Sequence, residues 1–74
     1  MITTEQAKKM FEEMIFSKRG EYQFEQMSEI VTDDPFYVMI AVDKNGNQVF
    51  PGEIFPSIRK RDGALIDYSF PETG

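Results

Sequence analysis

The sequence predicts an α+β domain in which an N-terminal helix packs on a small antiparallel β-sheet. Three observations support this. Apolar residues recur at helical spacing from Ala7 to Ile15, a run of β-branched and aromatic residues extends from Phe36 to Val42, and turn pairs containing glycine separate the later apolar segments. We expect the order α-β-β-β-β, a meander of three to five strands, and a single domain over residues 1–74.

The helix is expected from about Thr4 to Lys18. Thr3 and Gln6 have the spacing of a capping box, in which each side chain bonds the backbone amide of the other residue. Gly20 follows where a left-handed residue commonly ends a helix. The apolar stripe that would face the sheet consists of Ala7, Met10, Phe11, Met14 and Ile15.

Residues 21–31 permit two interpretations. Their Glu, Gln and Met content favours a helix by propensity. The turn sequence at 32–35, directly before a strong strand, favours a β-hairpin instead, and we favour the strand. A regular strand would place Tyr22, Phe24 and Ile30 on one face. It would place Glu21, Glu25 and Glu29 on the other.

The strand predicted at 36–42 is apolar on both faces, which is typical of a central strand covered on both sides. One helix covers only one face well. We expect the second face to be covered by the proline-rich loop at 50–56, by a second copy of the chain, or by a partner. The loop is the favoured cover, through three large side chains: Phe50, Ile54 and Phe55.

Two turns complete the expected sheet. Asn45-Gly46 is a strong hairpin signal that predicts a positive φ at Gly46, with a return strand at 48–50. Asp62-Gly63 predicts a second hairpin between strands at 57–61 and 64–70.

The composition argues against several classes of function. The net charge is −5, with 13 acids and 8 bases, which argues against direct nucleic-acid binding. The longest apolar run is far shorter than the roughly 20 residues of a membrane span. The chain has no cysteine, and its first residues lack the basic and apolar regions of a secretion signal, so we expect a cytoplasmic protein.

Catalysis and cofactor binding are not expected. The chain has no histidine and no cysteine, which are the commonest general base and strong nucleophile. The stretch from Asp43 to Asn47 begins like a calcium-binding loop, but glycine falls at its fourth position and Ile54 at its twelfth, so the pattern fails. We predict no catalytic residues, no metal site and no cofactor.

Two surfaces are candidates for partner binding. From Gly20 to Asp43 the chain has no Lys or Arg. Its acids are expected to form one acidic face, which could dock a basic protein. The apolar loop is the second candidate. The basic run from Arg59 to Arg61 is interpreted as charge on an exposed edge strand, which discourages aggregation. The acidic face comprises Glu21, Glu25, Glu29, Asp33 and Asp34.

These observations predict a small non-enzymatic protein-binding or inhibitory domain with a basic protein partner. Small acidic proteins of phages and mobile elements often inhibit nucleic-acid-handling enzymes in this way. The alternative is a structural or accessory module completed by self-association, as a homodimer joined through an apolar sheet face.

Overall fold

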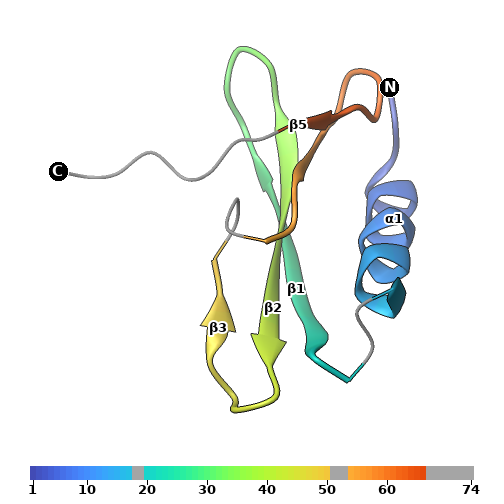
Figure 1. Ribbon diagram of the computed structural model, residues 1–74. Coiled ribbons are helices and arrows are strands. Elements are labelled where there is room, and N and C mark those ends of the chain that lie inside the picture. The colour runs from blue at the N-terminus through green and yellow to red at the C-terminus, as the bar shows by residue number, and fades with distance from the viewer. Residues whose placement is uncertain (18–19, 51–53, 67–74) are drawn as a thin grey trace, which may run out of the picture.

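The structure, a computed structural model, describes residues 1–17, 20–50 and 54–66. One helix, α1 (Thr4–Ser17), precedes five strands in an antiparallel sheet, and it lies to one side of that sheet (Figure 1). The predicted α+β fold is therefore confirmed. The strands are β1 (Tyr22–Ile30), β2 (Phe36–Asp43), β3 (Gln48–Val49), β4 (Ser57–Arg59) and β5 (Leu65–Ile66).

Strand β2 is the centre of the sheet. One of its edges pairs with β1 along nearly its whole length. The other edge is shared: Ala41 and Val42 pair with β3, whereas Phe36 and Tyr37 pair with β4. Strand β5 then pairs with the outer edge of β4. The chain therefore returns to β2 after β3, and β3 and β4 lie one after the other along the same edge.

Helix α1 begins as the sequence predicts. The Thr3 amide donates to Gln6 Oε1 at 2.8 Å, and the Gln6 amide donates to Thr3 Oγ1 at 3.1 Å, which are the two bonds of a capping box. Gly20 has a φ of 91°, as expected after a helix. The predicted end at Lys18 lies outside the described residues. Among the described residues, α1 is too short and too polar to cross a membrane.

The hydrophobic core lies between α1 and one face of the sheet. Ala7 and Phe11 of the helix are fully buried. In antiparallel strands, paired residues point to the same face, so the register fixes which strand residues meet the helix. The sheet and loop side chains in this cluster are Tyr37, Met39, Ala41, Val49, Phe55 and Ile58.

A β-bulge interrupts β1. The register shifts between Phe24, opposite Ala41, and Gln26, opposite Ile40, so Glu25 is an extra residue. The strand prediction for this segment is confirmed, but the face prediction is wrong beyond Phe24. Because one residue is inserted, Ile30 lies opposite Phe36 and points away from the helix.

The face of β2 away from the helix is also buried in part: Phe36 and Val38 are 2% and 0% exposed. The expectation that the apolar loop forms a lid on this face is wrong for Phe55. Its ring packs on the helix side instead, edge-on to Tyr22 with the centroids 5.5 Å apart. Phe50 and Ile54 are exposed.

The turn between β2 and β3 depends on Asp43. Its Oδ1 accepts the amides of Asn45 and Asn47 at 2.8 and 2.9 Å. Gly46 has the predicted positive φ, 84°, and its amide donates to the Asp43 carbonyl. No described residue other than glycine has a positive φ, so Asn45 is not left-handed and this is a three-residue loop closed by a left-handed glycine.

Phe11→Ala tests the core. Phe11 is fully buried against the sheet, so its truncation should lower the free energy of unfolding by about 3–5 kcal/mol, measured by urea denaturation. Phe16→Ala is the matched control, because this side chain on the same helix is 66% exposed. Its loss should stay near 0.5 kcal/mol. Equal losses would show that Phe11 is not the core contact of α1.

Gly46→Val tests the turn. Nothing lies within 4 Å of a Cβ at this position, so the substitution acts only through the positive φ. A β-branched residue held there is strained by roughly 1–3 kcal/mol. We expect a lower melting temperature by circular dichroism, and little change for Lys44→Val in the same exposed turn. An unchanged melt for Gly46→Val contradicts the turn geometry.

Candidate functional site

The five acids of the predicted acidic face do not share one face. Glu25 accepts a hydrogen bond from Gln48 Nε2 at 3.2 Å, and Gln48 lies beside Val42 on the face away from the helix. Glu29 lies opposite Tyr37, on the helix side. The prediction that Glu25 and Glu29 point the same way is wrong, because the bulge inverts the alternation between them.

Glu29 has a charged partner. Its carboxylate forms an ion pair with Lys60, in the turn after β4. This hydrogen bond, outweighing the effect of desolvation, raises the pKa of Lys60. The Lys60 ammonium lies 6.0 Å from the centre of the Tyr37 ring, at the limit of a cation–π contact. Glu29 and Lys60 thus join the end of β1 to the second hairpin.

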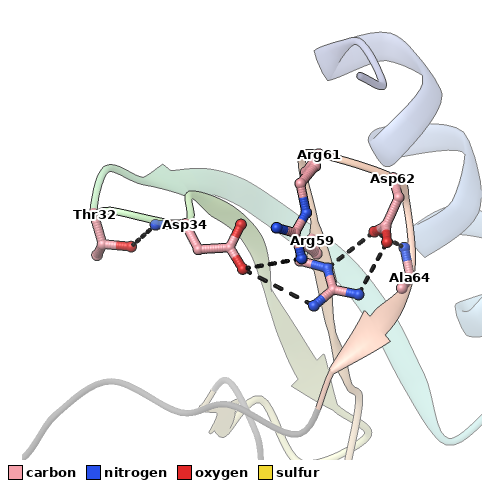
Figure 2. A network of polar contacts seen from close by, with 6 residues as sticks. All are labelled: Thr32, Asp34, Arg59, Arg61, Asp62 and Ala64. Atoms are coloured by element: carbon pink, nitrogen blue, oxygen red, sulfur yellow. Dashed lines mark hydrogen bonds and ion pairs between the residues drawn. The ribbon is translucent and has the colours of Figure 1, made fainter.

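Asp34 meets the same basic segment. Its Oδ2 lies 3.9 Å from Arg59 Nη1 and 3.9 Å from Arg61 Nη2, with both arginines directed at the turn before β2 (Figure 2). The Asp34 amide donates to Thr32 Oγ1 at 3.2 Å, which fixes that turn. The basic run, interpreted from the sequence as charge on an exposed edge strand, therefore contacts two of the five acids, Glu29 and Asp34.

Arg59 makes its shortest bonds with Asp62. Arg59 Nε and Nη2 donate to the two carboxylate oxygens at 3.0 and 2.9 Å, a bidentate geometry (Figure 2). Asp62 Oδ1 also accepts the Ala64 amide at 3.0 Å. These two sets of bonds lower the pKa of Asp62 from 3.8 to about 2, and the bond to Asp62 raises the pKa of Arg59. The basic run therefore joins two turns, rather than decorating an edge strand.

Among the residues that the structure describes, Glu21, Glu25 and Asp33 are the predicted site acids without an ion-pair partner. All three are exposed, and within residues 1–17, 20–50 and 54–66 none of them forms an ion pair. Asp33 lies in the turn before β2, at the compensated end of the hairpin. Glu21 and Glu25 bracket the first half of β1, and so define the acidic end of the predicted site.

Hollows border this first half of β1, and two of them lie beside the backbone of Tyr22 and Gln23. One, of about 360 Å³, separates the strand from the end of α1. The other, of about 410 Å³, lies where β1 and β2 meet the turn at Gly46. The first is lined by Glu12, Ile15, Phe16, Gly20, Tyr22, Gln23 and Phe24. The second is lined by Gly20, Glu21, Tyr22, Gln23, Val42, Asp43, Lys44 and Gly46.

The three large side chains of the apolar loop differ in their exposure to solvent. Phe50 and Ile54 are 58% and 42% exposed, whereas Phe55 is 6% exposed and belongs to the core. Only the first two are therefore accessible to a partner.

The sequence analysis did not identify the residues of α1 that line the hollow beside β1. Phe16 was the available signal, because it is a large apolar residue outside the stripe that faces the sheet. Gln23 gave no such signal.

Within the described part of the chain, no group of three or more His, Cys, Asp or Glu side chains is arranged to hold a metal ion. Comparison with known protein families, curated proteins and solved structures finds no match to this chain.

Asp62→Asn tests the ion network through pH. The folded-state pKa of Asp62 is lowered to about 2 from 3.8, so its ionised form stabilises the fold fully above pH 4. That stabilisation is lost as the pH falls toward 2. The difference in melting temperature between wild type and Asp62→Asn should therefore be largest near neutral pH and shrink in acid. Asp33→Asn is the control, with little effect at any pH. A pH-independent deficit for Asp62→Asn contradicts this assignment.

Proposed function

We propose that this chain is a non-enzymatic binding module that docks a basic protein through the acidic first half of β1. The observation that carries the proposal is the uneven compensation of charge. Arg59, Lys60 and Arg61 engage the acids at one end of the β1–β2 hairpin, whereas Glu21 and Glu25 at the other end form no ion pair among the described residues.

Electrostatics at such a site favours fast association. Exposed charges steer an oppositely charged partner toward the surface, and salt screens this attraction over about 10 Å at 0.1 M. An inhibitory role follows if the partner uses the same cationic surface to hold nucleic acid, because the two then compete for it. The missing histidine and cysteine support binding rather than catalysis.

Self-association through an apolar sheet face has weaker support. It needs exposed apolar side chains on the face of β2 away from the helix. Phe36 and Val38 of that face are already buried, at 2% and 0% exposure. The apolar loop offers Phe50 and Ile54 as a second contact, but a contact there would depend little on salt.

Charge reversal tests the proposal, with immobilised oligolysine as the probe. Glu21→Lys and Glu25→Lys should each weaken binding at low salt, mainly by slowing association, and the difference should fade at high salt. Glu13→Lys is the matched control, because it makes the same charge change at an exposed position on α1.

The three reversals should leave the melting temperature nearly unchanged, since surface charges usually contribute about 0.5 kcal/mol or less. Equal weakening by all three variants would show that net charge alone attracts the probe. No binding by the wild type at low salt would overturn the proposal.

A further inference from the structure

Among the described residues, the outer edge of β1 is an open edge of the sheet. In the strand order, β1 is terminal, and no strand among the described residues pairs with its outer edge. In the lower half of Figure 1, β1 lies on the side of β2 nearer to α1, and β3 lies on the opposite side. An edge of this kind presents backbone donors and acceptors to any extended chain that reaches it.

The hydrogen bonds between β2 and its neighbours β3 and β4 show which residues of β1 turn their backbone donors and acceptors outward. The Asp43 amide donates to the Asn47 carbonyl at 2.9 Å, and the Lys60 amide donates to the Pro35 carbonyl at 3.0 Å. Odd-numbered residues of β2 thus turn their backbone groups toward β3 and β4. Because successive residues of a strand point in opposite directions, even-numbered residues of β2 bond to β1.

Gln23 lies opposite Val42 and is therefore bonded within the sheet. Its neighbours Tyr22 and Phe24 turn their N–H and C=O groups outward. The bulge at Glu25 ends this regular stretch and discourages a longer, non-specific pairing. The open edge is thus a short segment, Tyr22 to Phe24, with acids at both ends.

The side chains around this edge differ between its two faces. On the helix side, a strand added beside Tyr22 and Phe24 would direct its side chains into the 360 Å³ hollow, against Ile15 and Phe16. On the other side, its side chains would lie near Gln23, with Glu25 on that face and Glu21 lining the neighbouring hollow. The first environment offers apolar contacts with Ile15 and Phe16, beside Glu12. The second offers carboxylates to Lys or Arg, through Glu25 and through Glu21 in a hollow that Lys44 also lines.

We infer that the partner adds an extended segment, in which apolar and basic residues alternate, as a further strand on the outer edge of β1 at Tyr22–Phe24. Main-chain bonds hold the segment, the hollow beside α1 receives its apolar side chains, and Glu21 and Glu25 attract its basic ones. This inference rests on the proposed function and specifies how the acidic end recognises its partner.

Amide exchange with a synthetic peptide tests the inference. The probe alternates Lys and Val over seven residues, and its control has the same composition with the three Val residues adjacent. With free alternating peptide at about ten times its Kd, exchange at Tyr22 and Phe24 should slow about tenfold, because the exchange rate is proportional to the unbound fraction, about one eleventh. The Gln23 amide, already bonded within the sheet, should change little. The control peptide should bind more weakly.

Two variants locate the apolar contact. Phe16→Ala should weaken binding of the alternating peptide about fivefold or more, as expected for an aromatic anchor. Phe50→Ala, which truncates an exposed phenylalanine on another surface, should not. Binding that responds to Glu21→Lys but leaves the Tyr22 and Phe24 amides unprotected refutes strand addition and leaves the proposed function standing.

If the wild type binds neither the alternating peptide nor oligolysine, both proposals are refuted. Protection of Tyr22 and Phe24 that rises with protein concentration in the absence of peptide shows that a second copy occupies the edge, which also contradicts the inference.

Discussion

The extra residue in β1 is the constraint on which the other features of this molecule depend. With Glu25 inserted between Phe24 and Gln26, the apolar side chains of β1 that face the helix are Tyr22 and Phe24 before the bulge and Met27 after it. The residues of β1 that face the helix have even numbers up to Phe24 and odd numbers beyond the bulge. The same insertion turns Glu29 toward Lys60, and so ties β1 to the second hairpin. One residue thus sets both the core contacts and the charge pairing of the strand.

The bulge also divides the β1–β2 hairpin into two ends with different chemistry. At the end near the 32–34 turn, acids and bases are close enough to compensate each other, and a bidentate bond joins Arg59 to Asp62. At the other end, Glu21 and Glu25 flank a stretch of β1 whose outer edge pairs with no described strand and which lines two hollows. Exposed ion pairs add little stability individually, so the pairs at the first end mainly position the turns.

Much of the fold could be predicted from sequence because its signals are local. The capping box at Thr3 and Gln6, the apolar stripe of α1 and the glycine at position 46 each act through neighbours a few residues away. The site could not be predicted in the same way. A bulge in a strand rich in Glu and Gln leaves no glycine or proline to mark it, and every face assignment beyond Phe24 depends on it. The pairing of Glu29 with Lys60 joins residues 31 positions apart, and no local pattern encodes it.

Cross-strand proton contacts by NMR test the bulge most directly. In antiparallel sheets, α-protons are close in the pairs that do not exchange backbone hydrogen bonds, whose Cα atoms lie about 4.5 Å apart. With the bulge, the α-proton of Met27 should contact that of Met39, and Glu29 should contact Tyr37. Contacts of Gln26 with Met39 and of Ser28 with Tyr37 would mean a regular strand. That result would return Glu29 to the face of Glu25 and contradict the division of the hairpin described above.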